Sequence, residues 1–288
     1  MTSHLNPLVK RQLRLNQETL DHWSLYLPHR ENIHRLLAQT LQPVSARLCV
    51  LGAGNCNDLD LTDLTSRFAQ VHLVDLDQQG LVKGVERQIL PDPERLILHG
   101  GFDITGILKT LANWQRNRPK QESIDYCVRE AMAFVGLPFL GRFEVTISTC
   151  LLTQIIDSVV SITGSSSIPF KLIQALRLRH LRLLAELLLP GGVGILVTDF
   201  ALTHGHTTKS RKGSPQDGNN PLCQGSHFLG VSPEELCKMV KNDIVLQSVL
   251  HQARTTPPWF WQQNYRRTLL VTAIQFQRRN EQPRLLEL

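Results

Sequence analysis

The sequence of 288 residues lacks the segments typical of proteins that enter or cross membranes. No apolar run reaches the roughly 18 residues that a helix needs to span a bilayer. The N-terminus, MTSHLNPLVKRQLRLNQ, has no apolar core of the kind found in signal peptides. The cysteines form no C-x-x-C pair, which argues against structural zinc and favours reduced thiols. We therefore expect a cytoplasmic protein without membrane contact and without a metal site.

The chain also lacks a concentrated run of positive charge, although its formal net charge is +6. The basic excess is compatible with an RNA substrate, but it is spread along the chain. No stretch interleaves basic and aromatic residues as a nucleic-acid stacking platform does. The 42% hydrophobic and 19% charged residues are typical of a globular protein, and the length suits one large domain. Nucleic acid is thus a weaker candidate partner than a small molecule.

What the sequence does contain is a strand–turn–helix–strand pattern between residues 47 and 77. Arg47–Leu51 is a short apolar run, typical of a buried parallel strand, that stops at Gly52. Gly52 and Gly54 allow a tight turn and the close approach of a ligand. Residues 71–74 predict a second strand, which ends at Asp75. Ligands bind at the carboxyl ends of such strands, so this pattern predicts a cofactor that contains a nucleoside.

The helix between these strands decides which nucleoside cofactor is favoured. Residues 55–68 predict this helix, with Asn57 or Asp58 as its N-cap. Asn57 stands where the dinucleotide fingerprint has its third glycine, and an Asp58 carboxylate at the helix N-terminus would repel a pyrophosphate. S-adenosylmethionine has no phosphate, and an acidic turn is compatible with its sulfonium and ammonium groups. A nicotinamide- or flavin-binding Rossmann domain is the alternative.

In three places the sequence resembles class I S-adenosylmethionine-dependent methyltransferases: the loop Leu51-Gly52-Ala53-Gly54-Asn55, the strand at 71–75 and the later Leu189-Pro190-Gly191-Gly192. It departs from the fuller family loop at Val50 and Cys56, where the family often has an acidic residue and a third glycine. The resemblance implies an α/β fold with a Rossmann-like, doubly wound, mostly parallel seven-stranded sheet whose last strand is antiparallel. It also implies an N-terminal helical lid, residues 1–44, on a single methyltransferase domain, residues 45–288.

The same resemblance implies which residues bind the cofactor. They belong to the glycine turn and to the ends of the second, third and fourth strands: Gly52, Ala53, Gly54, Asn55, Asp75, Leu76, Asp103, Ile104, Ser148 and Thr149. Asp75 would hold the ribose, because a carboxylate accepts hydrogen bonds from two neighbouring hydroxyls. Asp103 would bind the adenine amino group, cap a helix at 104–113, or do both. Arg30, in the lid, would pair with the methionine carboxylate or be a surface helix residue.

The remaining elements follow from apolar periodicity and from β-branched residues. Further strands are predicted at 95–99, 143–148, 193–197, 244–250 and 268–277, and helices at 80–88, 171–189 and 232–241. Trp259, Trp261 and Tyr265 precede the last strand, where they would wall a pocket or anchor the connector. Segments 114–140 and 203–230 carry no motif, and the second is predicted to gate the substrate site.

Catalytic residues are less well defined than the cofactor site. Methyl transfer from a sulfonium mainly requires alignment and exclusion of water, with a general base only for a neutral oxygen or a protonated amine. Asp199, His204 and His206 follow the fifth strand and are the candidate bases, although no motif supports them. The sequence therefore predicts an S-adenosylmethionine-dependent methyltransferase with a small-molecule acceptor, and RNA or protein methylation is the alternative.

Overall fold

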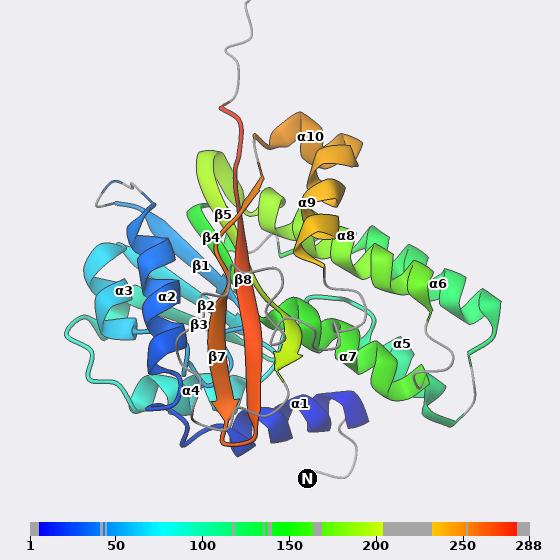
Figure 1. The fold of residues 1–288 in the computed structure, drawn as a ribbon, viewed down its shortest axis with the longest axis horizontal. Coiled ribbons are helices and arrows are strands. Elements are labelled where there is room, and N and C mark those ends of the chain that lie inside the picture. The colour runs from blue at the N-terminus through cyan, green and yellow to red at the C-terminus, as the bar shows by residue number, and fades with distance from the viewer. Residues whose placement is uncertain are drawn as a thin grey trace, which may run out of the picture.

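The computed structural model describes residues 6–40, 43, 45–116, 119–134, 136–137, 140–163, 169–203, 232–251 and 253–280. Within them, eight strands form one sheet in the order β3-β2-β1-β4-β5-β8-β6, and β7 also pairs with β8 (Figure 1). The strands are β1 (Arg47–Leu51), β2 (Gln70–Asp75), β3 (Leu96–Gly100), β4 (Phe143–Thr149), β5 (Leu188–Thr203), β6 (Arg254–Thr255), β7 (Trp259–Asn264) and β8 (Arg267–Gln277). Strands β1 to β5 are parallel to one another, and β8 is antiparallel to β5. This arrangement confirms the predicted Rossmann-like α/β fold.

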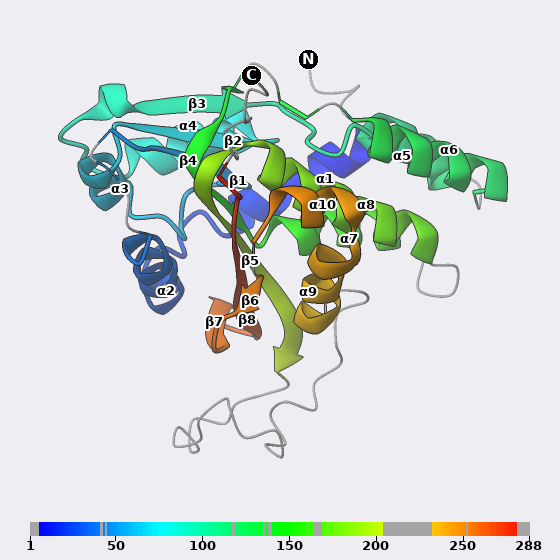
Figure 2. The ribbon, with the colours of Figure 1, turned by 90° about the horizontal axis from the view of Figure 1, so that it is seen from above.

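Helices cover both faces of the sheet (Figure 2). One face packs against α2 (Leu27–Ala38), α3 (Leu61–Arg67) and α4 (Gln78–Glu86). The other packs against α5 (Leu108–Ala112), α6 (Gln121–Ala133), α7 (Leu151–Thr163), α8 (Phe170–Glu186), α9 (Pro233–Asn242) and α10 (Ile244–Val249). Side chains alternate along β1, so Leu48 and Val50 enter the first core while Cys49 and Leu51 enter the second. The 3₁₀ turns η1 (Pro93–Arg95) and η2 (Asn113–Arg116) lie in connections, and α1 (Pro7–Glu18) contacts α5 and α4.

Residues 244–250 were expected to form a strand, but they form helix α10 followed by an isolated bridge at Leu250. The carboxylate of Asp243 accepts a hydrogen bond from the Leu246 backbone N–H, and this N-cap favours a helical turn over extended backbone. Leu246 is the buried residue of α10, so the apolar run does not fill the core as a central strand would. Segments β6 and β7 pair with β8 instead, which is why eight strands rather than seven are present in the described part.

Helix α3 begins later than the sequence indicates. Its N-cap is Asp60, whose carboxylate accepts from the Asp63 backbone N–H at 3.0 Å, and not Asn57 or Asp58. The residues after the glycine turn form an irregular turn before the helix begins at Leu61. The N-terminus of α3 is therefore farther from the glycine turn than a helix capped by Asn57 would be.

Two further boundaries differ from the expected ones. Helix α8 ends at Glu186 and β5 begins at Leu188, so Pro190 lies inside the strand and does not end the helix. The helix expected at 104–113 begins only at Leu108. Both differences lie at chain turns, where local sequence patterns are least specific.

The aromatic residues of the connector anchor β7 to α2. The His29 ring stacks on Trp261 with centroids 4.4 Å apart, and Trp259 Nε1 donates to His29 Nδ1 at 3.0 Å. Tyr26 meets Trp261 edge to face at 5.2 Å, and Trp261 is only 5% exposed. Tyr265, in contrast, is 82% exposed at the β7–β8 turn. Of the two roles considered for these aromatics, the contacts of Trp259 and Trp261 are those of anchors.

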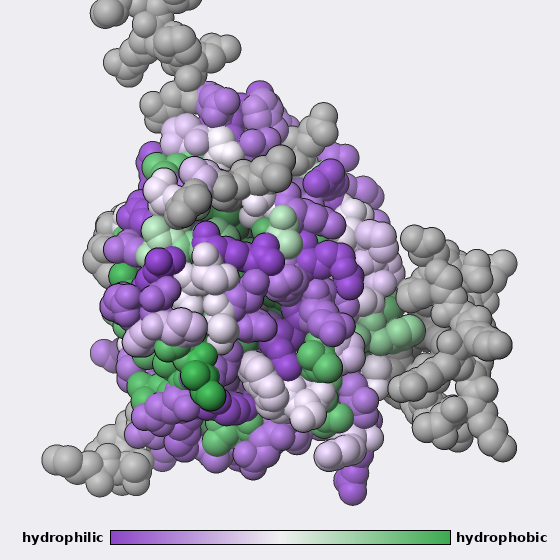
Figure 3. Space-filling view, turned by 90° about the vertical axis from the view of Figure 1, so that its left-hand side faces the viewer, coloured by the Kyte–Doolittle hydropathy of each residue, from purple (hydrophilic) through white to green (hydrophobic). Residues whose placement is uncertain are grey.

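The described residues contain no helix that is both long and apolar enough to cross a membrane. On the side of the molecule that carries α3 in Figure 1, hydrophilic residues cover most of the visible described surface (Figure 3). Hydrophobic residues form separate patches between them. This face therefore has the mixed character usual for the exterior of a globular domain.

Candidate functional site

The glycine turn after β1 is held directly beside Asp75. The Gly54 N–H donates to Asp75 Oδ2 and the Asp77 N–H to Asp75 Oδ1, each at 2.8 Å. Gly52 has a φ of +80°, and a Cβ added there would lie 2.7 Å from Leu151 Cβ, so both the conformation and the packing require glycine. A carboxylate has about four acceptor positions, and two of those on Asp75 are used by the backbone. The other two can accept the hydroxyls of a ribose.

Asp103 is held in a similar way after β3. Its carboxylate accepts from the Thr105 N–H at 2.9 Å, from Thr105 Oγ1 at 2.6 Å and from the Leu108 N–H at 2.9 Å. The last of these contacts reaches the first residue of α5, so Asp103 does satisfy a helix N-terminus, although this helix starts four residues later than expected. With three acceptor positions used, one remains for an amino group.

The structure brings together four of the predicted cofactor residues around one pocket. Its strand side is lined by Val74, Asp75, Leu76, Phe102, Asp103, Ile104, Thr105 and Ile107. The helices complete it with Leu108 and Leu111 of α5, Leu151, Gln154, Ile155 and Ser158 of α7, Leu176 of α8, and Gln12 and Asn16 of α1. We call this the nucleoside pocket. Its apolar walls between two carboxylates suit a flat base attached to a sugar. The free space is only about 50 Å³, enough for a few water molecules.

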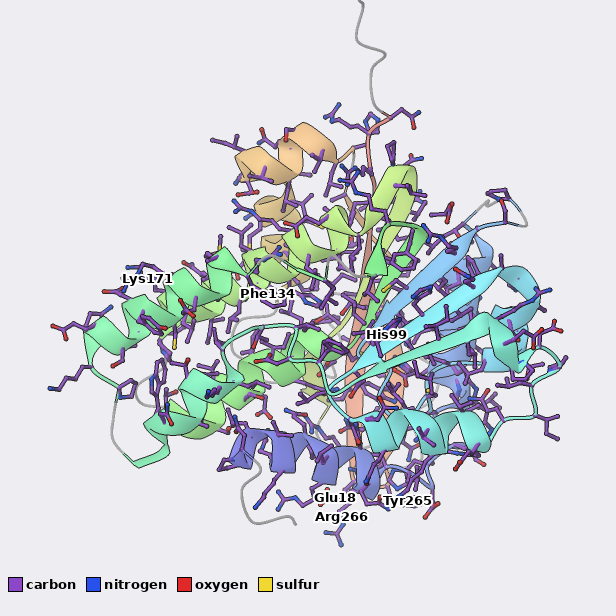
Figure 4. All side chains as sticks on the ribbon, turned by 180° about the vertical axis from the view of Figure 1, so that it is seen from behind. Glu18, His99, Phe134, Lys171, Tyr265 and Arg266 are labelled. Atoms are coloured by element: carbon purple, nitrogen blue, oxygen red, sulfur yellow. The ribbon has the colours of Figure 1, made fainter. Side chains whose placement is uncertain are left out.

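Helix α1 forms the roof of this pocket. Figure 4, in which Glu18 marks the end of α1, shows the helix crossing the end of the sheet. Asn16 Oδ1 lies 3.3 Å from the position that a Cβ on Gly54 would take, and Asn16 Nδ2 donates to Asp77 Oδ2 at 3.2 Å. Asn16 therefore occupies the space above the glycine turn. No local pattern in the sequence indicates the contact between Asn16 and Asp77, because these residues are 61 positions apart.

The asparagines of the glycine turn fasten the N-terminal segment. Asn55 Nδ2 donates to Asn16 O at 2.8 Å, and Asn57 Nδ2 donates to Thr19 O at 2.6 Å. Arg87, at the end of α4, adds a hydrogen bond to Asn57 Oδ1 at 2.6 Å. These amide contacts explain why the loop has asparagine where a dinucleotide fingerprint has glycine. The role of Asn55 in holding a cofactor stays a prediction.

Arg30 is buried and points toward the same turn. Its guanidinium donates to Asn57 O at 2.7 Å and to Trp23 O at 3.1 Å, and its Cζ lies 3.5 Å from the centre of the Trp23 ring. The expectation of a surface helix residue is wrong, since Arg30 is only 6% exposed. Its contacts hold the chain between α1 and α2 on the glycine turn. Pairing of Arg30 with a methionine carboxylate stays a prediction.

Ser148 and Thr149 point into the protein at the end of β4. Ser148 Oγ lies 2.8 Å from Nε2 of His180 on α8, and Thr149 Oγ1 donates to Gly52 O at 2.9 Å. Burial lowers the pKa of His180 to about 4, so the imidazole is neutral at pH 7 and hydrogen-bonds with the hydroxyl. Neither Ser148 nor Thr149 lines the nucleoside pocket. Thr149 acts on the site by fixing the carbonyl of Gly52.

Negative charge collects at this edge of the sheet. Burial raises the pKa of Asp58 to about 7 and that of Asp75 to about 6, and burial also raises the pKa of Asp199 above its usual value. Thr153 Oγ1 donates to the Asp199 carboxylate. Among the described residues, none of the three carboxylates forms a salt bridge. A cationic ligand would relieve the cost of ionising them, and an anionic one would increase it.

Two of the candidate bases, His204 and His206, lie outside the described residues. Asp199 lies on β5, beyond the residues that line the nucleoside pocket. Asp58 does not cap α3, and burial raises its pKa, with a smaller contribution from the nearby Asp75 carboxylate that the sequence does not indicate. In the described part of the chain, no three His, Cys, Asp or Glu residues are arranged to hold a metal ion.

Comparisons with known proteins give similarities of fold at low identity. No protein-family model matches the sequence, and no curated protein matches it. Among solved structures, it is similar to the YcgJ protein of Bacillus subtilis (12% identity, TM-score 0.45, 88% of this chain and 100% of that one). It is also similar to a phosphoethanolamine N-methyltransferase 2 of Haemonchus contortus (12%, 0.44, 87% and 52%) and to the CurJ carbon methyltransferase (16%, 0.37, 82% and 50%). Since all of these TM-scores are below 0.5, they do not identify a ligand or an activity for this chain.

Proposed function

We propose that this protein is an S-adenosylmethionine-dependent methyltransferase that acts on a small-molecule acceptor. The observation that carries the proposal is the joint presence of Asp75 and Asp103 in the nucleoside pocket, at the ends of adjacent strands and beside the glycine turn. The acceptor positions left on Asp75 match a ribose diol, and the one left on Asp103 matches an amino group of adenine. Leu76 and Ile104 supply apolar surface for the two faces of the base.

The charge of the site favours this cofactor over a dinucleotide. Burial raises the pKa of Asp58, and the nearby Asp75 carboxylate contributes to the rise. A pyrophosphate beside them would add two negative charges to partly buried carboxylates, whereas a sulfonium adds a positive charge. The first residue of α3 also lies beyond the turn, so the N-terminus of this helix is not directed at a phosphate there.

The residues of the chain would bind, orient and desolvate, while the cofactor supplies an activated methyl carbon. Helix α1 would exclude water from the nucleoside pocket, and Asn16 would have to leave the glycine turn, because the present space of about 50 Å³ is too small for a nucleoside. Asp199, oriented by the Thr153 hydroxyl, would take the proton of an amine or hydroxyl acceptor. The spread of the basic residues along the chain supports a small acceptor over RNA.

Calorimetry with the full chain tests the proposal. S-adenosylmethionine and S-adenosylhomocysteine should bind, and Asp75→Ala should weaken both by about 10- to 100-fold, because hydrogen bonds to a charged group contribute about 1.5–3 kcal/mol. Asp92→Ala is the matched control, since it removes a carboxylate before β3, at the opposite end of that strand. Binding of NAD(P) alone, or equal affinity of the wild type and Asp75→Ala, would overturn the proposal.

A further inference from the structure

A second hollow lies at the far end of the sheet from the nucleoside pocket. It measures about 570 Å³ and is bordered by the end of α9, the end of α10, β6 and the residues that follow β8. Arg254 of β6 pairs with Gln275, and two residues farther on Gln277 pairs with Val193, near the start of β5. The carboxyl ends of the parallel strands, where the nucleoside pocket lies, are at the other end. In Figure 1, α9 and α10, which border the hollow, are in the upper part of the view, and α1 is at the bottom.

The charged residues that border this hollow are all basic. They are Lys241, Arg254 and Arg279, and His251 lies with them; none of the residues that line the hollow is an aspartate or glutamate. None of the three cations forms a salt bridge with another described residue. Three positive charges from three separate elements therefore border one concave surface without a neutralising partner in the described part of the chain.

The neighbouring helix α8 shows that carboxylates in this region are already used. Arg177 pairs with Glu235 of α9 at 3.2 Å, and Arg182 pairs with Asp243 at 2.6 Å. Glu235 of α9 and the C-cap residue Asp243 thus neutralise arginines of α8. This difference separates structural arginines, which fasten α9 to α8, from arginines that remain available for a ligand.

The backbone under these cations is fixed. The Arg279 N–H donates to Val249 O at 2.8 Å, and the His251 N–H donates to Gln277 O at 2.7 Å. Arg254 Nε donates to Gln275 Oε1 at 3.2 Å, which orients its guanidinium along β8. Val240 and Leu250 are buried at the base of the hollow, so an ion bound above them would be partly shielded from water.

We propose that this hollow binds the phosphate group of a small anionic ligand. Arginine guanidinium groups recognise phosphate with paired hydrogen bonds, and a lysine adds a point charge. A single concave site bordered by three exposed cations fits one compact phosphate or pyrophosphate group, whereas an RNA backbone would need a row of cations along an extended surface. The site is separate from the nucleoside pocket, so it does not depend on the proposed methyltransferase activity.

Calorimetric titration of the full chain with inorganic pyrophosphate, at low salt, tests this site. The wild type should show saturable binding of one pyrophosphate per chain, and Arg254→Ala combined with Arg279→Ala should weaken it at least tenfold. Arg266→Ala is the matched control for charge: it removes one exposed cation at the β7–β8 turn, at the other end of the molecule (Figure 4). Arg254→Lys combined with Arg279→Lys should keep more of the affinity than the alanine pair, because both charges remain.

Three results would overturn the proposal. They are the absence of saturable pyrophosphate binding by the wild type, an equal loss of affinity in Arg266→Ala, and an unchanged affinity in the double alanine variant. A single-stranded RNA oligonucleotide serves as the competing ligand. If it binds through Arg254 and Arg279 while pyrophosphate does not bind, the hollow is a nucleic-acid contact instead. Thermal unfolding of each variant distinguishes a loss of binding from a loss of folding.

Discussion

The two N-terminal helices have the same length, 12 residues each, but they are attached to the domain in opposite ways. Helix α1 fully buries only Leu8, packs Val9 partly against the core, and is further held by polar contacts, among them Asn6 Nδ2 to Leu108 O and Gln12 Nε2 to Ser158 Oγ. Helix α2 buries His29, Arg30, Ile33, Leu36 and Leu37, and its aromatic neighbours stack on β7. One helix covers the nucleoside pocket, and the other is part of the hydrophobic core.

This difference indicates which helix can move. Burying a large apolar side chain contributes about 1.5–3 kcal/mol, whereas an exposed ion pair contributes about 0–1 kcal/mol. Separating α2 from β7 would expose several apolar side chains together, while lifting α1 breaks contacts that water can replace. We therefore expect α1 alone to act as the lid predicted for residues 1–44, and α2 to stay in place.

Truncation should give the largest effect. Deleting residues 2–18 should leave a folded protein whose free energy of unfolding is lower by about 2–5 kcal/mol, because one buried leucine and several polar contacts are removed. Deleting residues 2–44 should abolish folding, because β7 and the core beside it lose the side chains that cover them. Urea unfolding followed by circular dichroism measures both. Similar stabilities of the two truncated proteins would show that α2 is no more integral than α1.

Trp261→Ala should cost about 3–5 kcal/mol, because it leaves a cavity between α2 and β7 where Tyr26 and His29 now pack. Tyr265→Ala is the matched control: it removes an aromatic side chain from the same hairpin, but one that is 82% exposed, and should change stability by less than about 0.5 kcal/mol. Denaturant midpoints give both values. Equal effects of the two substitutions would contradict the role of Trp261 as an anchor.

Acid should weaken the attachment of α2. Burial lowers the pKa of His29 to about 3, with a contribution from the nearby Arg30 charge, and its Nδ1 accepts from Trp259 only while the ring is neutral. His29 binds a proton near pH 6.5 in the unfolded chain but not in the folded chain. Its contribution to the free energy of unfolding is therefore fully present above pH 6.5 and is lost as the pH falls toward 3. Between pH 6.5 and 4.5 this group should lower the free energy of unfolding by about 2–3 kcal/mol.

The variant His29→Gln isolates that contribution, since the amide can still accept from the indole but does not titrate. Burial also lowers the pKa values of His72 and His180 to about 4. These two groups change the pH dependence of stability equally in the wild type and in the variant. The difference between the pH dependences of the wild type and the variant, measured by urea unfolding, therefore reports His29. If the two dependences have the same slope, the neutral state of His29 does not contribute to the docking of α2.

The comparison also shows what the sequence could and could not predict. Asp75 was predicted at the binding edge because strand ends in a parallel sheet meet at one edge, a rule that depends on local pattern and chain order alone, and Asp103 was predicted there from the family resemblance. Asn16 above Gly54 was missed because nothing near residue 16 records a partner on the glycine turn. The prediction of a strand at 244–250 was wrong because the N-cap Asp243 favours a helix more than the short β-branched run favours a strand. Local signals thus predicted the sheet and its binding edge, while the contacts of α1 and α2 depend on the packed structure.

A substitution at the contact between α1 and α7 should have the smallest effect on stability. It should nevertheless change the rates at which a ligand binds and leaves. Arg11 forms a salt bridge with Asp157, and both side chains are partly exposed, so Arg11→Ala should change stability by at most about 1 kcal/mol. Loss of the salt bridge should favour a position of α1 away from the nucleoside pocket. Association and dissociation of S-adenosylhomocysteine should therefore both become severalfold faster, which stopped-flow fluorescence measures. Lys171→Ala removes a similar exposed salt bridge, with Asp125, away from the pocket and should change neither rate. If Arg11→Ala also leaves both rates unchanged while the ligand still binds, α1 does not gate the nucleoside pocket.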